Sequence, residues 1–235
     1  MLGKTIQQNR QLNSGRLFSK LFHLEGVEHT YDNGITALKS VSFTMDPKEI
    51  IFITGPSGAG KSTLLNILAQ EIKPTGGYFD FTPPSRDFFI ARVRQHLDLM
   101  EKRSCYEHLL SSFDPSIYKS EKYFEQELQD LVRFLGFDDR LSIKMHEANG
   151  GLRQKVAIVR ALLARPNLFI ADEPTSSLDT TNAQKLFEVL DIYNRKRSMG
   201  IIWASHNREL VRQFSGRIVH LEKGCVIHSG HACFI

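Results

Sequence analysis

Gly55-Pro56-Ser57-Gly58-Ala59-Gly60-Lys61-Ser62-Thr63 stands between an apolar run and a helical pattern. The run, residues 50–53, predicts a buried strand, and apolar residues within 64–68 recur at helical spacing. A glycine-rich loop in that position folds its backbone N–H groups around phosphate oxygens, and the helix start adds its positive dipole end. We therefore predict that residues 55–63 bind the phosphates of a nucleotide. A chance glycine turn before a helix is the alternative.

Two side chains of this loop carry specific chemistry. Lys61 supplies a positive charge for the β- and γ-phosphates. The Ser62 hydroxyl can ligate Mg²⁺. A nucleoside triphosphate with Mg²⁺ is the ligand that this pattern predicts.

The composition limits the class of protein. The chain has 235 residues, of which 41% are hydrophobic, which suits one large domain or a domain with an inserted subdomain. A net charge of +4 gives no reason to expect a nucleic-acid partner. The sequence has no long apolar run, so we expect no membrane span, and three cysteines without paired spacing favour the reducing cytoplasm. Residues 1–20 are basic without acids and predict a tail, either solvated or touching a membrane surface or partner.

Hydrophobic patterns predict alternating strands and helices along the chain. Two antiparallel strands precede the phosphate loop, and buried strands alternate with helices after it. Strands are expected at residues 23–31, 37–45, 50–53, 78–81, 88–93, 168–171, 201–204, 217–221 and 225–228, and helices over 96–147, 152–164 and 181–195 besides the one after the loop. This order predicts an α/β fold with a mostly parallel sheet.

Polar side chains follow the predicted strands where these end. Gln95, Asp172-Glu173 and His206 stand at such ends, and the carboxyl ends of parallel strands meet at one edge, where ligands bind. Asp172 is predicted to hold Mg²⁺, and Glu173 to act as general base or to orient the attacking water. A helix-capping pair is the alternative. His206 can donate to the γ-phosphate or be structural, and Tyr31 can stack on adenine or only pack.

These motifs, in this order, resemble the ATPase domain of ABC transporters over residues 22–228. The resemblance implies that Gln95 is the glutamine-loop residue, with a catalytic and a metal-binding role, and that His206 is the switch histidine. It implies that Tyr31 stacks on adenine and that residues 176–179 form the D-loop, with Asp179 at the nucleotide. Two such domains would pair head to tail, as a homodimer or heterodimer. ATP and Mg²⁺ would lie between one phosphate loop and the partner's signature helix.

The signature sequence of that family is altered in this chain. The family reads Leu-Ser-Gly-Gly-Gln, whereas residues 148–152 read Ala-Asn-Gly-Gly-Leu. The helix start can still aim N–H groups at an anion, so the resemblance implies that Asn149, Gly150 and Gly151 touch the nucleotide. Asn149 offers an amide donor with a different reach from the serine hydroxyl. We hypothesise a slow ATPase, or one whose partner subunit supplies a better signature.

The resemblance also implies a division of the chain. It predicts a P-loop NTPase core with a small antiparallel β subdomain, formed by residues 21–95 and 161–235. An inserted helical subdomain, residues 96–160, would carry the signature. Residues 1–20 would remain outside both as the basic tail.

Within the family, residues 94–100 and 186–195 resemble the FtsE cell-division subgroup. That implies an FtsX-like integral membrane partner, or another permease, and ATP-driven control of peptidoglycan hydrolysis. The ATPase itself would be peripheral, at the cytoplasmic face of the inner membrane. A helix of the partner would dock near residues 95–100 and Tyr106, unless these residues only pack the subdomain. The alternatives are the ATPase of a LolD- or MacB-like exporter and a weakly hydrolysing, ATP-gated clamp.

Overall fold

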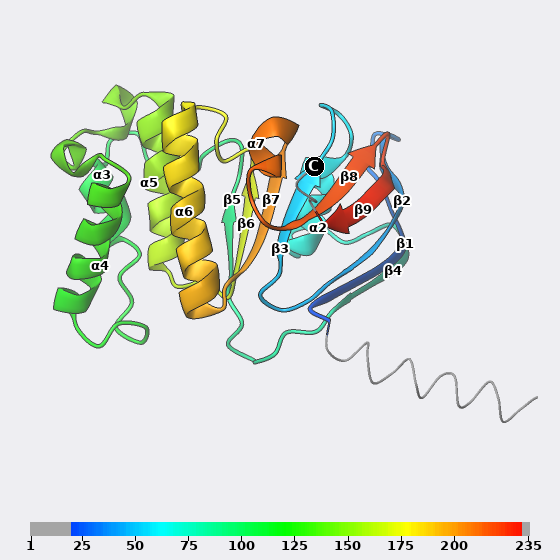
Figure 1. Cartoon of the computed structure of the whole chain (residues 1–235), viewed down its shortest axis with the longest axis horizontal. Helices are drawn as coiled ribbons and strands as arrows, with labels where there is room; N and C mark the ends of the chain where they lie inside the picture. The colour runs from blue at the N-terminus through cyan, green and yellow to red at the C-terminus, as the bar shows by residue number, and fades with distance from the viewer. Residues whose placement is uncertain (1–19, 232–235) are drawn as a thin grey trace, which may run out of the picture.

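The computed structural model describes residues 20–231. Within this range the strands form one nine-stranded sheet with the order β4-β1-β2-β9-β8-β3-β7-β6-β5 (Figure 1). The strands are β1 (Phe22–Thr30), β2 (Thr36–Met45), β3 (Ile50–Thr54), β4 (Gly76–Phe81), β5 (Ile90–Val93), β6 (Leu168–Asp172), β7 (Gly200–Ser205), β8 (Arg217–Glu222) and β9 (Cys225–His231). The expected basic tail, residues 1–20, lies outside the described residues except for Lys20.

Strands β1, β2 and β4 form the antiparallel part of the sheet. β1 pairs antiparallel with β2 on one side and with β4 on the other. β2 then joins the remaining strands through one parallel pair, Ser40 with Cys225 in β9. The predicted antiparallel strands are therefore present, and they continue the main sheet.

The parallel part of the sheet runs through β8, β3, β7, β6 and β5. β6 and β7 are buried along their whole length, as expected for parallel strands that are covered on both faces. The hairpin partner β9 pairs antiparallel with β8, so the sheet as a whole is mixed. The carboxyl ends of β3, β7, β6 and β5 lie side by side along one edge, which brings the segments after them together.

Helices cover both faces of this parallel part. α2 (Lys61–Leu68) packs on one face over an apolar cluster shared with the strands. α5 (Gly150–Leu163) and α6 (Thr180–Arg197) pack on the other face over a second cluster. α3 (Cys105–Leu110) and α4 (Glu121–Phe134) lie beyond α5, farther from the sheet (Figure 1). The sheet therefore separates two hydrophobic cores.

The segment between β5 and α5 contains less helix than the sequence pattern predicts over residues 96–147. Besides α3 and α4 it has two short 3₁₀ turns, Asp138–Arg140 and Met145–Glu147, and the remainder is loop. The side chain of Asp114 accepts the Ser116 N–H at 2.8 Å and so forms a turn in place of a helix. The five-residue α7 (Arg208–Arg212) has no counterpart in the prediction, because it is too short to show a period.

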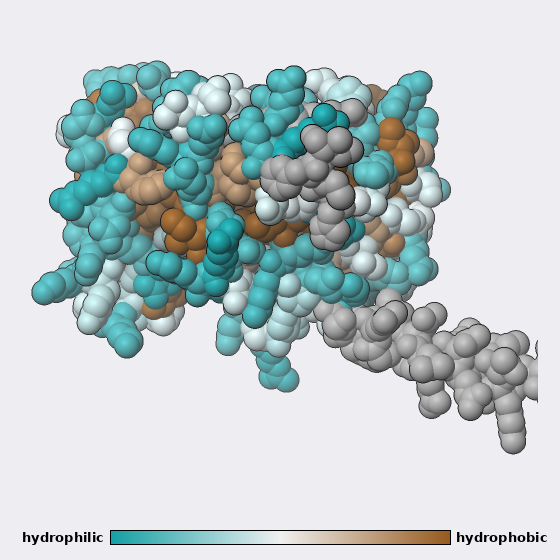
Figure 2. All heavy atoms as spheres, viewed as in Figure 1, coloured by the Kyte–Doolittle hydropathy of each residue, from teal (hydrophilic) through white to brown (hydrophobic). Residues whose placement is uncertain are grey.

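The surface is predominantly polar on the face drawn in Figure 2, where hydrophobic residues show only in small groups. Among residues 20–231, no helix combines the length and the hydropathy that crossing a bilayer requires.

Candidate nucleotide-binding site

The loop between β3 and α2 needs glycine where its backbone approaches other strands. Gly60 has φ +99°, and a Cβ there would lie 2.6 Å from the Ala37 carbonyl oxygen. A Cβ on Gly55 would lie 2.3 Å from the backbone oxygen of Leu221. Both distances are too short for any side chain, so this loop conformation depends on glycine at the two positions.

Lys61, the first residue of α2, folds back over its own loop. Its Nζ donates to the carbonyl oxygens of Gly55 at 2.9 Å and Pro56 at 3.2 Å. The residue is only 8% exposed, and Nζ lies 3.8 Å from Glu173 Oε1. The lysine charge is thus held at the phosphate loop and beside a carboxylate, while the neighbouring Ser62 side chain is exposed.

Asp172 and Glu173 stand at the carboxyl end of β6 and are both buried. Glu173 has φ 51°, which turns its side chain away from the strand direction of Asp172. His206, just after β7, places Nδ1 2.9 Å from Glu173 Oε1, and its imidazole is 64% exposed. Gln154 of α5 donates from Nε2 to the Glu173 carbonyl oxygen at 3.2 Å. Lys61 and His206 therefore both lie next to one carboxylate oxygen of Glu173, Oε1.

The residues predicted to hold a metal ion offer hard oxygen donors. Ser62 lies in the first turn of α2, which packs against β6, and Asp172 ends that strand on the same face. Gln95 follows β5, the neighbour of β6, and its side chain is exposed. A hydroxyl, a carboxylate and an amide oxygen match the preference of Mg²⁺ for oxygen ligands, so the donor set fits this ion.

Tyr31 lies directly after β1, beside the end of the phosphate loop. Its hydroxyl is 3.0 Å from Thr63 Oγ1, and its ring meets the His29 ring edge-on at 4.6 Å between centroids. The residue is 39% exposed. The partly exposed ring beside the loop is suitable for stacking with a base.

Asn149, Gly150, Gly151 and Asp179 come together in a second place, a pocket of about 620 Å³. Asn149 caps α5 by accepting the Leu152 N–H through Oδ1 at 2.9 Å. Asp179 caps α6 by accepting the Asn182 N–H at 2.8 Å. The starts of two helices therefore face one pocket, and none of the described residues that line it belongs to the phosphate loop.

The sequence reasoning missed three cations in this pocket, Arg140, Lys155 and Lys185. Lys155 donates to the Leu135 carbonyl oxygen at 2.6 Å, and burial lowers the pKa of its ammonium group. The Asn182 N–H lowers the pKa of Asp179, the only acid among the described residues that line the pocket, so this acid stays ionised. With three cations, one acid and two helix starts, the pocket favours an anion. Helical spacing could have identified Lys155, which lies four residues after Gly151 on the same face.

A second residue that sequence reasoning missed is Arg92 in β5. Its side chain is only 10% exposed, and its Nη2 lies 3.8 Å from Asp172 Oδ2. The sequence does contain a signal for this residue, a charged side chain between Ala91 and Val93 in a predicted strand. Because side chains alternate along a strand, Arg92 must point to the opposite face from these two residues, and that face is also covered.

Known proteins resemble this chain in sequence and in structure. A protein-family model described as ABC transporter matches residues 38–176. The cell division ATP-binding protein FtsE of Streptococcus pneumoniae serotype 2 (strain D39) is 30% identical over 218 residues, which cover 88% of this chain and 94% of that protein. The phosphonates import ATP-binding protein PhnC of Bdellovibrio bacteriovorus is 31% identical over 229 residues, covering 89% and 88%.

A solved structure extends the likeness to the fold. The ATP-binding cassette MJ0796, as a dimer in a post-hydrolysis state bound to ADP and Pi, has a TM-score of 0.77 and 28% identity, covering 91% of this chain and all of that one. The family match spans more than half of the 235 residues. The chain therefore belongs to the ABC transporter family, as an ATP-binding subunit with ATPase activity.

Proposed function

We propose that two ATPase chains of this kind bind ATP between them, head to tail. The observation that supports this arrangement is the pocket at Asn149 and Asp179, which favours an anion although none of its described lining residues belongs to the phosphate loop. The phosphate loop of one chain would hold the nucleotide, and this pocket of the other chain would contact the γ-phosphate. The partner can be a second copy or a related ATPase chain.

Within one site, each side chain has a proposed task. The loop N–H groups and Lys61 bind the β- and γ-phosphates, and Tyr31 stacks on the adenine. Ser62, Asp172 and Gln95 would hold Mg²⁺, which neutralises charge on the phosphates when bound. Glu173 orients the attacking water and accepts its proton.

His206 is proposed to act on the same carboxylate. Its Nδ1 contacts Glu173 Oε1 and so fixes the direction of the general base. The second carboxylate oxygen remains available for water. Attack on the γ-phosphate would then release ADP and inorganic phosphate, and the pair would open.

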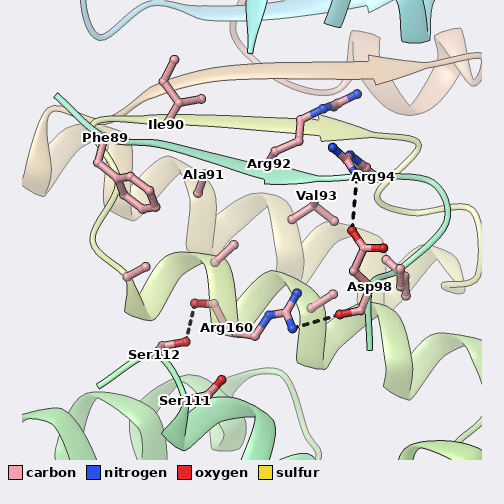
Figure 3. A pocket seen from close by; sticks show the side chains of 14 residues that line it. Phe89, Ile90, Ala91, Arg92, Val93, Arg94, Asp98, Ser111, Ser112 and Arg160 are labelled. Atoms are coloured by element: carbon pink, nitrogen blue, oxygen red, sulfur yellow. Dashed lines mark hydrogen bonds and ion pairs between the residues drawn. The ribbon is translucent and has the colours of Figure 1, made fainter. Parts of the chain in front are cut away.

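A groove between β5 and α5 is the proposed docking place for an integral membrane partner. Its volume is about 380 Å³. Figure 3 shows Phe89, which precedes β5, with Ala91 and Val93 of β5 on one side, and Arg160 of α5 with Ser112 on the other. Gln95 lies two residues after the end of this strand, so a helix seated in the groove would be able to act on the nucleotide site. We assign the chain a peripheral position at the cytoplasmic face of the cell membrane.

The same groove marks the proposed division of the chain. Residues 21–95 and 161–235 would form the ATP-binding core with its antiparallel β subdomain. Residues 96–160 would form the helical subdomain. The partner would then contact both parts and change their relative position as ATP is bound and hydrolysed.

For the physiological role we propose an FtsE-like subunit that acts with an FtsX-like partner in cell division. The similarity to FtsE and the sequence of residues 94–100 support it. A LolD- or MacB-like exporter ATPase is the alternative, and the comparable identity to PhnC adds an import ATPase. Co-purification of the tagged chain from membranes decides among them. A four-helix FtsX-like protein is expected, and a different permease would contradict the cell-division role.

A second candidate function is a weakly hydrolysing clamp that pairs on ATP. The specific observation in its favour is Asn149 with Leu152 in place of the family's serine and glutamine. A turnover far below one per minute with normal ATP-dependent pairing would favour the clamp.

Pairing is tested with the Glu173→Gln variant, which should trap bound ATP. Light scattering after gel filtration is expected to give the dimer mass with ATP and the monomer mass without it. Gly151→Asp serves as the matched variant, because an added carboxylate in the anion pocket should block pairing while ATP still binds. A monomer of Glu173→Gln at saturating ATP would contradict pairing between two copies of this chain.

A further inference from the structure

Arg92 is a buried cation that lacks partners for part of its guanidinium group. Its Nη2 donates to Asn66 Oδ1 at 3.3 Å and lies 3.8 Å from Asp172 Oδ2. Within residues 20–231, Nε and Nη1 of Arg92 are buried with no hydrogen-bond partner. Burying a guanidinium with unpaired nitrogens costs free energy that packing alone does not explain.

The position of Arg92 follows from the strand geometry. Side chains alternate along β5, and Figure 3 shows Arg92 on the opposite side of the strand from Ala91 and Val93. Arg92 is in register with Ile170 of β6, so Asp172 lies two residues farther along the same face. The guanidinium therefore reaches toward the carboxyl edge of the sheet, where Asp172 ends its strand.

The second neighbour, Asn66, relates Arg92 to the phosphate loop. Asn66 lies four residues after Ser62, on the same face of α2 and one turn further into the molecule. The guanidinium thus contacts both α2 and β6, the elements that would supply the metal ligands Ser62 and Asp172. Burial lowers the pKa of Arg92 while Asp172 and Glu71 raise it, and an arginine stays charged in such a setting.

We infer that Arg92 is the counter-charge of Asp172 and sets how much Mg²⁺ the nucleotide site requires. This inference rests on the proposed role of Asp172 as a ligand of the ion. Without metal, Arg92 balances the buried carboxylate and fixes its Oδ2 side. Mg²⁺ must compete with this fixed charge for the Asp172 carboxylate, so the site binds Mg²⁺ more weakly than an unopposed carboxylate would. Arg92 acts through Asp172 and is a positioning residue.

The direct test is a Mg²⁺ titration of nucleotide binding, followed by fluorescence anisotropy of an N-methylanthraniloyl ATP analogue. Arg92→Met keeps the length of the side chain and removes the charge. It is expected to lower the half-saturating Mg²⁺ concentration by about fivefold or more. Nucleotide affinity in EDTA should stay within about twofold of the parent value, because Arg92 does not contact the phosphate loop itself.

Arg94→Met is the matched control. Arg94 lies two residues on, carries the same charge and pairs with Glu71 at 3.0 Å, but its side chain is half exposed. Its removal changes the net charge equally and should leave the Mg²⁺ requirement unchanged. A shift as large as that of Arg92→Met would overturn the inference, since net charge alone would then explain it.

Asp172→Asn separates the inference from the function on which it rests. The variant should raise the half-saturating Mg²⁺ concentration, and adding Arg92→Met to it should cause no further change. If Asp172→Asn has no effect, the proposed metal-ligand role is wrong. If Asp172→Asn shifts the titration and Arg92→Met leaves it unchanged or raises it, the inference about Arg92 is wrong. Arg92→Gln, which can keep the contact with Asn66, replaces Arg92→Met if that variant does not fold.

Discussion

His206 Nδ1 lies 2.9 Å from Glu173 Oε1, and the Lys61 ammonium lies 3.8 Å from the same oxygen. One nitrogen from the start of α2 and one from the segment after β7 therefore meet on one oxygen of the proposed general base. They fix the carboxylate from one side, and its other oxygen is free of both. In the proposed site, this geometry would link binding of the phosphates, through Lys61, to the orientation of the base.

Replacing Glu173 by glutamine is expected to lower kcat for ATP hydrolysis by about 10²–10⁴-fold, because the base is lost while the shape is kept. ATP affinity should change little, since the phosphates are proposed to bind to the loop and Lys61. His206→Ala should lower kcat less, because it only loosens the carboxylate. A steady-state phosphate-release assay measures both. Glu188→Gln, on the exposed face of α6, is the control, and an equal loss there would rule out a specific role.

Asn149→Ser is expected to raise the ATPase rate by about threefold or more, because in the proposed pair serine would supply a hydroxyl donor at the γ-phosphate. Serine also caps a helix, so the thermal midpoint should stay the same. The measurement is kcat at saturating ATP. An unchanged rate would contradict the idea that Asn149 limits turnover.

Asn149→Ala provides the comparison for that experiment. It removes the bond that Oδ1 accepts from the Leu152 N–H, and losing such a cap costs about 1 kcal/mol. Both stability and rate should fall in this variant. Together the two substitutions separate the capping role of residue 149 from its proposed contact with the nucleotide.

Glu127 of α4 is expected to stabilise the fold through ionised contacts. It accepts hydrogen bonds from Tyr193 at 2.7 Å and contacts Arg165 and Arg197 at 2.8 Å each. Burial alone would raise its pKa, but the bonds from Arg197, Arg165 and Tyr193 outweigh burial and lower the pKa below its ordinary value of 4.5. Glu127→Gln should therefore lower the free energy of unfolding at pH 7 by about 1–3 kcal/mol.

The pH dependence of that difference follows from the sign of the shift. A depressed carboxyl pKa adds stability above the unfolded value and loses it as pH falls through the folded value. The gap between the parent and Glu127→Gln should shrink as pH falls below 4.5. Urea denaturation at several pH values measures it. Asp130→Asn on the exposed side of α4 is the control, and a pH-independent gap would contradict the ionic explanation.

Two glycines of the phosphate loop should differ when replaced by alanine. Gly58 has φ +77° and open space around its Cβ position, so Gly58→Ala should cost about 1 kcal/mol of backbone strain. Gly60 adds the 2.6 Å approach to the Ala37 carbonyl oxygen, so Gly60→Ala should cost more than about 2 kcal/mol. Denaturant midpoints compare them, and equal losses would show that the close approach has no energetic weight.

Much of the parallel sheet could be predicted because its strands are buried on both faces. Residues 50–53, 168–171 and 201–204 are continuous apolar runs, and polar residues follow each of them. The structure has β3, β6 and β7 at these places. Since parallel strands end on the same edge, the closeness of Lys61, Glu173 and His206 followed from their positions after those runs.

The remaining features depend on tertiary contacts that a local pattern does not contain. Nothing in the sequence near Asn149 indicates that its pocket includes Asp179 and Lys185. These residues belong to the start of α6, which follows β6 in the sequence and comes close to the start of α5 only in the folded chain. Alternation predicts the face that Arg92 takes, but only the register of β5 with β6 shows that Asp172 is its neighbour. Part of the loop structure within residues 96–147 could have been predicted, because Asp114-Pro115-Ser116 consists of residue types that form turns and interrupt helices.

The buried Gln154 has a consequence for how two nucleotides would relate. It lies one turn past the Asn149 end of α5 and donates to the Glu173 carbonyl oxygen. In the proposed pair, one end of α5 would sense the nucleotide held by the other chain, while Gln154 touches the base that serves the nucleotide of its own chain. The two sites would then be coupled through α5 of each chain. ATP bound at one site would affect the general base at the other, and hydrolysis at one site would change the other without any contribution from the membrane partner.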